Sequence, residues 1–265
     1  MPVLCYQITG ATTPNARSTT GALDGQLSAI LKCDHAEANA QVYSELAANR
    51  LAAFLGIPVV IGVPAVDAQG ESPVRFAALR AAEAGLNFYD FTSDDHGDPD
   101  ECAVYDTPPL PAGVLLSAGH LRAVQSLCEK YPLQTAAIAV FDLWIGNNDR
   151  AFNFKAQLAA RERGVIFALD QGSSLLACHA EVGDSLRELE NAGFPSFHPF
   201  QKLVNARYCG AMVERISSMP DWAVQAATTY DDTVGNVTLD EQYATYGALL
   251  ARKQFLGGLV DRVLL

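Results

Sequence analysis

The chain has 265 residues, 49% of them hydrophobic and 18% charged, and a formal net charge of −12. Such a chain can bury a substantial core, as one large domain or as two smaller lobes, so a disordered protein is excluded as the default. The negative charge repels phosphate backbones over most of the surface and argues against direct nucleic-acid binding, although a local basic groove could still hold a nucleotide.

Six cysteines are scattered along the chain without a CxxC pair or a neighbouring group of histidines. Neither a zinc site nor a disulfide framework is therefore indicated, and the cysteines fit a reducing compartment. No apolar run reaches the roughly 18 residues of a membrane helix, and the N-terminus lacks a basic region followed by an apolar core. We expect a soluble, cytoplasmic protein with no membrane partner.

Residues 1–33 alternate short apolar runs with one small polar segment, which predicts a strand, a loop and a second strand that ends at Lys32. In the loop, the hydroxyls of Ser18, Thr19 and Thr20 lie among glycines whose backbone amides could cradle phosphates. There is no Walker signature, so an ordinary surface loop is the better interpretation of this segment taken alone. Taken alone, Lys32 is interpreted as a solvated lysine at a strand end.

The segment 35–55 has apolar residues at helical spacing, and Gly56 is placed to end this helix in a left-handed conformation. Glu45 lies in the middle of the predicted helix. Glu37 lies two turns earlier, on roughly the same face, and is the alternative acidic position.

Two strands are predicted next, over Pro58–Val66 and Val74–Leu79, and would complete a small N-terminal sheet. The acidic segment 89–101 follows. It lacks the alternate-position spacing of a calcium loop, so a solvated loop is favoured over a docking site for a basic partner.

The proline-rich run Thr107–Gly113 marks the expected boundary between an N-terminal lobe, residues 1–112, and a C-terminal lobe, residues 113–265. The second lobe is predicted to be mostly helical, with Ser117 as the cap of its first helix. Apolar spacing predicts helices over 117–129, 133–145, 183–191, 200–217, 220–228 and 239–264.

Three histidines in this lobe, His120, His179 and His198, are dispersed without ligand spacing. Surface or capping roles are therefore favoured over metal binding or catalysis. Ser173 and Ser174 have no neighbouring histidine that would make either of them a nucleophile.

The stretch 141–172 carries the residues around which a reaction can be built. A predicted helix ends at Gly146 and leaves Asp149 in a loop, and a short apolar run, 165–169, predicts a strand that ends at Asp170. Two carboxylates placed in this way, with an asparagine between them, suit metal-assisted phosphoryl transfer. One would orient the attacking hydroxyl, and the other would hold magnesium.

The string WIGNNDRAFNF at 144–154, followed by ALDQG at 168–172, resembles the HipA-like kinase family, with its Asn-x-Asp-Arg-His loop and its Ile-Asp-x-Gly strand end. The first third of the chain adds a lysine-bearing strand and a helix with the step Ser44–Glu45, which runs into Leu-Gly-x-Pro at 55–58. These pieces occur in the order that a kinase requires. The resemblance does not extend to the C-terminal third.

This resemblance implies an α+β, two-lobed protein-kinase-like fold, with a small N-terminal β-sheet lobe that has one helix and a larger, mostly helical C-terminal lobe. It implies ATP and Mg²⁺ as cofactors. Asp149 would be the catalytic base, and Asn153 and Asp170 would be the magnesium ligands. The residues implied to bind ATP are Lys32, Glu45, Ser18, Thr19 and Thr20.

Within the resemblance, Glu45 is favoured over Glu37 as the partner of Lys32. We expect an ion pair between Lys32 and Glu45 that fixes the ammonium group over the phosphates. The backbone of Phe76–Leu79 is the candidate edge for the adenine base.

Two positions depart from the family pattern. Ala151 stands where the family has His, and Asn153 follows Asp149 by four positions where five is more usual. We nevertheless expect Asn153 and Asp170 to converge on one site facing the lobe cleft, with Lys32 across it.

Three functions stay open: a phosphotransferase acting on a hydroxyl, most simply of a protein; a nucleotide-binding pseudokinase; and an acidic interaction module that has kept only the fold. The first is favoured, because a pure interaction module has no need to keep a lysine and three carboxylates together in this order.

Overall fold

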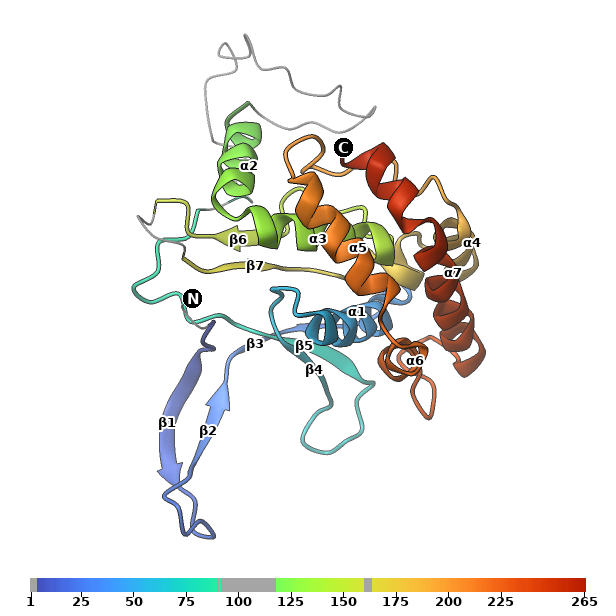
Figure 1. The fold of residues 1–265 in the computed structure, drawn as a ribbon. Helices are drawn as coiled ribbons and strands as arrows, with labels where there is room; N and C mark the ends of the chain where they lie inside the picture. The colour runs from blue at the N-terminus through green and yellow to red at the C-terminus, as the bar shows by residue number, and fades with distance from the viewer. Residues whose placement is uncertain (1–3, 90, 92–117, 160–163) are drawn as a thin grey trace.

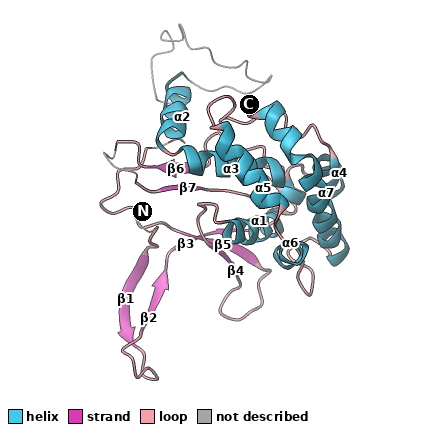
Figure 2. Cartoon of the chain, viewed as in Figure 1, coloured by secondary structure: helices cyan, strands magenta, loops and turns pink. Residues whose placement is uncertain are grey.

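The computed structural model describes residues 4–89, 91, 118–159 and 164–265. The fold is a mixture of helices and small antiparallel sheets, with most helices gathered on one side of the molecule (Figure 2). Most of the acidic segment 89–101, the proline-rich run 107–113 and the cap predicted at Ser117 lie outside the described residues.

The elements in chain order are β1 (Ile8–Pro14), β2 (Leu23–Leu27), β3 (Ala29–Lys32), α1 (Gln41–Leu55), β4 (Gly62–Ala65), β5 (Arg75–Leu79), α2 (Ala118–Lys130), α3 (Pro132–Ile145), β6 (Phe154–Ala156), β7 (Ile166–Ala168), the 3-10 turn η2 (Leu175–Ala177), α4 (Val182–Glu190), α5 (Ala206–Ser217), α6 (Asp221–Thr228) and α7 (Leu239–Val263). The six predicted C-terminal helices are all present. Only α5 begins clearly later than expected, because the Asn205 side chain caps it by accepting the backbone N–H groups of Arg207 and Tyr208.

The N-terminal sheet has the order β3-β5-β4, with both pairings antiparallel. Lys32 on β3 and Pro64 on β4 both lie opposite Phe76 on the central strand. Gly62 makes room for the Phe76 ring, since a Cβ at that position would lie 1.9 Å from it. The register therefore brings the end of β3, and with it Lys32, onto the face of the sheet where Phe76 is buried.

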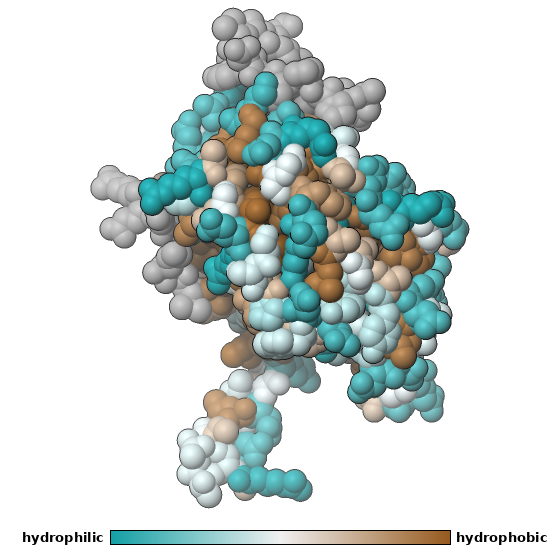
Figure 3. Space-filling view, turned by 45° about the vertical axis from the view of Figure 1, so that its right-hand side comes forward, coloured by the Kyte–Doolittle hydropathy of each residue, from teal (hydrophilic) through white to brown (hydrophobic). Residues whose placement is uncertain are grey.

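β1 and β2 form a separate two-stranded sheet, which extends away from the rest of the molecule (Figures 1 and 3). The predicted strand and loop are confirmed, but the loop is the tip of this hairpin. Its large apolar side chains Ile8, Leu23 and Leu27 are all exposed.

Helix α1 begins at Gln41, later than predicted, because residues 35–38 form a turn of their own. The Asp34 carboxylate accepts the backbone N–H of Val42 at 2.8 Å and so satisfies one donor of the first helical turn. The predicted C-terminal cap is confirmed, since Gly56 has φ 66°.

Helix α1 packs against the C-terminal helices as well as the N-terminal sheet. Tyr43 is buried and donates its hydroxyl to the carbonyl of Thr228, at the end of α6, at 2.8 Å. One hydrophobic core includes α1, α3, α6 and α7. The helix that carries Glu45 is thus held by both halves of the chain.

The hairpin β6–β7 follows α3, which ends at Gly146 in the left-handed conformation, with φ 69°. Ala168 on β7 exchanges backbone hydrogen bonds with Pro58 and Val60, in the segment after α1. This pairing places the end of β7 beside the N-terminal sheet. No described helix is long and apolar enough to cross a membrane.

Candidate active site

Lys32 lies between two carboxylates. Its Nζ is 2.5 Å from Glu45 Oε1 and 2.7 Å from Asp170 Oδ1. The predicted ion pair with Glu45 is confirmed, and Asp170 is a second partner. The alternative, Glu37, is exposed in the turn before α1.

The two ion pairs hold Lys32 and Asp170 in their charged forms. Burial alone would lower the pKa of Lys32, but Glu45 and Asp170 outweigh this effect and raise it. Burial alone would raise the pKa of Asp170, but Lys32 outweighs it and holds this pKa below its ordinary value. An ammonium group and a carboxylate therefore face the same space near neutral pH.

Asp170 adopts a left-handed backbone conformation just after β7, with φ 46°. Aspartate tolerates this region because its short side chain bonds locally, and Asp170 Oδ1 accepts the backbone N–H of Gly172 at 3.1 Å. The turn ends the strand and directs the Asp170 carboxylate towards Lys32.

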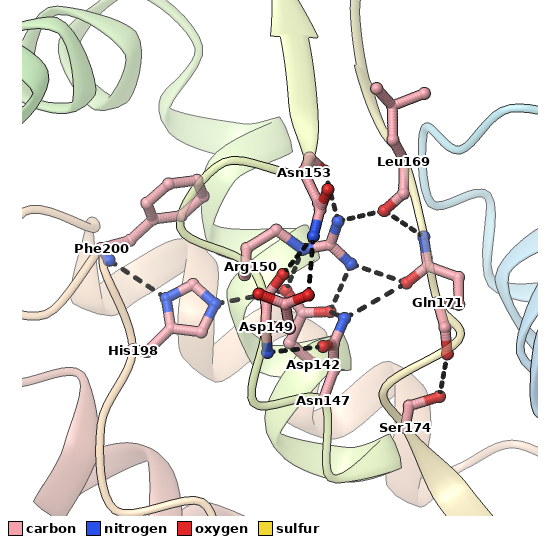
Figure 4. Close-up of polar contacts among 10 residues, drawn as sticks. All are labelled: Asp142, Asn147, Asp149, Arg150, Asn153, Leu169, Gln171, Ser174, His198 and Phe200. Carbon is pink, nitrogen blue, oxygen red and sulfur yellow. Dashed lines mark hydrogen bonds and ion pairs between the residues drawn. The ribbon is translucent and has the colours of Figure 1, made fainter. Parts of the chain in front are cut away.

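Asp149 and Asn153 lie together in the loop between α3 and β6. The Asn153 amide donates to the carbonyl of Asp149 at 2.7 Å and to its carboxylate at 3.1 Å (Figure 4). No hydrogen bond within the described residues engages Asn153 Oδ1, so this oxygen is available to a ligand. Partial burial, and then the charge of Asp170, raise the pKa of Asp149 above its ordinary value.

Lys32, Asn153 and Asp170 line one cavity of about 160 Å³, as their predicted convergence requires. A second hollow, of about 500 Å³, adjoins it, and the two share four lining residues, Ile30, Val60, Ala78 and Leu169. The two hollows form one cleft. Its narrow end is charged, and its wide end is lined by the chain that follows β5.

The candidate adenine edge needs a correction. β5 is the central strand, so the backbone of Phe76–Leu79 is bonded to a strand on each side. Among the described residues, the first backbone edge without a hydrogen bond comes at Ala81, whose neighbours Arg80 and Ala82 bond the N-terminal segment. In that antiparallel pattern, the N–H and C=O of Ala81 point to the opposite side, and Ala81 lines the wide end of the cleft.

Behind the loop, Arg150 and Asp142 form a buried ion pair that the sequence did not assign. Arg150 Nε donates to Asp142 Oδ2 at 2.7 Å, and Arg150 Nη2 donates to Asp142 Oδ1 at 2.9 Å (Figure 4). Burial alone would raise the pKa of Asp142, but Arg150 and His198 outweigh it and lower this pKa. The sequence contains one sign of this buried ion pair, because Asp142 is a charged residue within the apolar run of α3.

The rest of the Arg150 fork joins the loop to the end of β7. Arg150 Nη1 donates to the carbonyls of Asn153 and Leu169, both at 2.5 Å, and Nη2 donates to Gln171 Oε1 at 2.6 Å. One guanidinium therefore contacts the residue before Asp170, the residue after it, and Asn153 itself.

The surface or capping roles predicted for His120 and His198 are wrong. His120 is buried against Phe152, and His198 is buried with Nε2 3.2 Å from Asp142 Oδ2. His179 is exposed, as expected. Dispersed spacing argued against a metal site but could not show which histidine rings the fold would bury.

Ser18, Thr19 and Thr20 are not brought to the cleft. They lie at the tip of the β1–β2 hairpin, away from the body of the molecule (Figure 1). Within the described residues, the Ser18 hydroxyl is used locally, and it accepts the backbone N–H of Ala22 at 2.9 Å. Their contact with phosphates stays a prediction.

No family model and no curated protein sequence matches the chain. Among solved structures, the crystal structure of a Helicobacter pylori proinflammatory kinase, CtkA, is similar, with a TM-score of 0.58 at 14% sequence identity. The match covers 97% of this chain and 96% of that chain. This chain has a mixed α+β fold that is similar to the fold of this kinase.

Proposed function

We propose that this protein is an ATP- and Mg²⁺-dependent phosphotransferase of the HipA-like type, which moves the γ-phosphate to a hydroxyl group, most simply of a protein. The observation that carries the proposal is the position of Lys32. It is held by Glu45 and Asp170 at the charged end of a cleft, beside the loop of Asp149 and Asn153.

Lys32 is suited to bind phosphate. Glu45 is buried and fixes the ammonium group, while Asp170 is partly exposed and can exchange its partner. A nucleotide that arrives with a divalent cation supplies an anion for Lys32 and a cation for Asp170. The exchange leaves no buried charge without a partner, which keeps its electrostatic cost small.

The oxygen donors fit magnesium. Asp170 offers a carboxylate and Asn153 a free amide oxygen, the hard ligands that this ion prefers. No group of three or more His, Cys, Asp or Glu side chains able to hold a metal is found in the described part of the chain. That fits Mg²⁺, which is usually held by one or two protein ligands together with substrate phosphates. Bound magnesium would neutralise charge on the transferred phosphate.

Asp149 is placed to act as the base. Its side chain is exposed, so the hydroxyl of a large substrate can reach it. The Asn153 amide orients its carboxylate, and the raised pKa of Asp149 makes it a better proton acceptor than an ordinary aspartate.

The wide end of the cleft suits the base of the nucleotide. Its volume of about 500 Å³ lies in the usual range for small-molecule sites. The N–H and C=O of Ala81 form no hydrogen bond within the part of the chain that the structure describes, and they offer the donor and acceptor that an adenine edge requires. Contact of Ser18, Thr19 and Thr20 with the phosphates would require the β1–β2 hairpin to move towards the cleft.

A pseudokinase is the second candidate, and one observation favours it. Asn153 follows Asp149 by four positions where the family more often has five, and its amide is bonded to Asp149. The side chain could therefore serve that contact instead of binding a cation. The two functions differ in whether magnesium is needed for nucleotide binding and in whether phosphate is transferred.

The test is incubation of the purified protein with γ-labelled ATP and a cell lysate, with and without Mg²⁺. We expect magnesium-dependent labelling of protein, lost in Lys32→Met. Tight, magnesium-independent ATP binding without any labelling would overturn the phosphotransferase and favour the pseudokinase.

A further inference from the structure

Asp142 has a complete set of hydrogen-bond donors. Oδ1 accepts from Asn147 Nδ2 at 3.0 Å and from Arg150 Nη2 at 2.9 Å. Oδ2 accepts from Arg150 Nε at 2.7 Å and contacts His198 Nε2 at 3.2 Å. A carboxylate has about four lone-pair sites, so each site has one donor. Three donors come from 147–150, and only His198 comes from the C-terminal third.

The tautomer of His198 follows from its second contact. Its Nδ1 accepts the backbone N–H of Phe200 at 3.1 Å, so Nδ1 carries no hydrogen (Figure 4). In a neutral ring the proton is then on Nε2, which donates it to Asp142. Burial lowers the pKa of His198, in keeping with a neutral ring. Both ring nitrogens are therefore used.

The Asp142 carboxylate in turn fixes the plane of Arg150. The two bonds from Nε and Nη2 form a fork, which sets the direction of the remaining N–H groups. Those groups hold the carbonyls of Asn153 and Leu169. A rotation of the Asp142 carboxylate would rotate the fork and shift the loop relative to the end of β7.

We propose that His198 is a positioning residue for phosphotransfer: it completes the donors around Asp142 and so holds Arg150 in the orientation that sets Asn153 against Asp170. The inference rests on the proposed function of those two residues. His198 itself faces the buried side of the network and does not line the cleft.

Two amide variants separate the two contacts of the ring. His198→Asn has an oxygen where Nδ1 lies and can still accept the N–H of Phe200, but it is too short to reach Asp142. His198→Gln can place an N–H where Nε2 lies and can still donate to Asp142. The matched control is Gln242→Leu, since Gln242 is also buried and holds three backbone groups, those of Tyr230, Asp232 and Val237, which belong to none of the segments that Arg150 joins.

Three quantities are measured for each variant: the melting temperature, kcat for transfer from γ-labelled ATP, and the affinity for ADP with and without Mg²⁺. We expect kcat of His198→Asn to fall about 10- to 100-fold, the usual effect of removing a partner behind a metal site. The gain in ADP affinity from Mg²⁺ should shrink, while magnesium-free ADP binding should be unchanged. In His198→Gln, kcat and the gain in ADP affinity from Mg²⁺ should both be close to their wild-type values.

Gln242→Leu should lower the melting temperature while kcat and the magnesium effect stay at wild-type values. A folded His198→Asn protein with wild-type kcat and magnesium effect would overturn the inference, as would equal losses in His198→Asn and Gln242→Leu. A wild-type protein that transfers no phosphate would instead count against the proposed function. In that case the magnesium effect on ADP binding still tests His198.

Discussion

Two arginines are fully buried among the residues that the structure describes, and they are held in different ways. Arg150 pairs with the carboxylate of Asp142 and joins the loop of Asp149 to the end of β7. Arg252 on α7 has no carboxylate partner in the described part of the chain. It donates to the carbonyls of Leu143, Trp144, Leu189 and Phe194.

The difference lies in what each guanidinium holds in place. Arg252 satisfies carbonyls at the end of α3, where backbone acceptors have no partners within the helix. Burial lowers its pKa to about 10, which still leaves it charged at neutral pH. Arg150 bonds instead to segments that carry the candidate magnesium ligands. We infer that Arg252 serves stability and that Arg150 serves both stability and the site.

Replacing each arginine by methionine separates these roles and should give the largest effects. Arg150→Met leaves Asp142 as a buried charge with weakened partners, which costs about 3–5 kcal/mol of unfolding free energy. Its transfer rate should also fall. Arg252→Met should cost about 1–3 kcal/mol for carbonyls left without donors, with kcat per folded molecule close to wild type. Urea unfolding and single-turnover transfer measure the two quantities. An equal loss of kcat in both variants would erase the distinction.

The double variant Asp142→Leu/Arg150→Met sharpens the comparison. Removing both partners of a buried ion pair is often neutral or stabilising, so its unfolding free energy should exceed that of Arg150→Met by about 3 kcal/mol or more. Phosphate transfer should stay as low as in the single variant, because nothing then fixes the loop against the strand end. Recovery of the rate together with stability would reduce Arg150 to a purely structural role.

The pH dependence of transfer should report Asp149, the residue that the Arg150 network supports. A base works only when ionised, so the rate should be full above its pKa and lost as the pH falls through it. Since that pKa is raised, the acid limb of kcat should lie above 3.8, the ordinary value. In the nucleotide-free protein, the pKa of Asp149 followed by NMR should be lower in Asp170→Asn than in wild type, because one cause of the shift is removed. An unchanged pKa would exclude Asp170 as a cause of the shift, and an acid limb of kcat that does not follow the pKa of Asp149 would assign the titration to another group.

The smallest effect is expected at the partly exposed pair Lys32–Asp170. Asp170→Asn should lower the stability of the free protein by about 1 kcal/mol or less, because solvent screens this carboxylate. The pKa of Asp170 is lowered, so its contribution is present above the unfolded pKa and is lost as the pH falls through the folded one. Thermal melting of wild type and Asp170→Asn at neutral and strongly acid pH measures this contribution to stability. A stability loss that is equally large at acid pH would exclude the ion pair as its cause.

The sequence predicted the elements well where local signals agree. Apart from the starts of α1 and α5, apolar spacing and caps such as Gly56 and Gly146 located the helices to within a few residues, and the resemblance to the HipA-like family predicted the Lys32–Glu45 pair. Most of what it missed depends on tertiary packing. The pairing of β5 on both sides and the burial of His198 arise from segments distant in sequence, whereas the turn before α1 is a local feature that apolar spacing does not reveal.

The sequence identified the candidate reactive residues of the site, but it did not identify the residues that hold them in place. Asp149, Asn153 and Asp170 carry a recognisable order, whereas Asp142 and His198 lie 56 positions apart and meet only in the folded chain. The placement of Ser18–Thr20 could not be foreseen, because loop composition does not fix the direction in which a hairpin extends.

The most direct test of the central claim, that this cleft carries out magnesium-dependent phosphotransfer with Asp149 as base, compares Asp149→Asn with wild type in two assays on one preparation. Labelled transfer from ATP measures the rate, and calorimetry measures the affinity for ATP and Mg²⁺. We predict that the rate falls about 10²- to 10⁴-fold while the affinity changes by less than about threefold, because a base acts in the transition state. A comparable loss of ATP affinity, or a rate that survives the substitution, would contradict the claim.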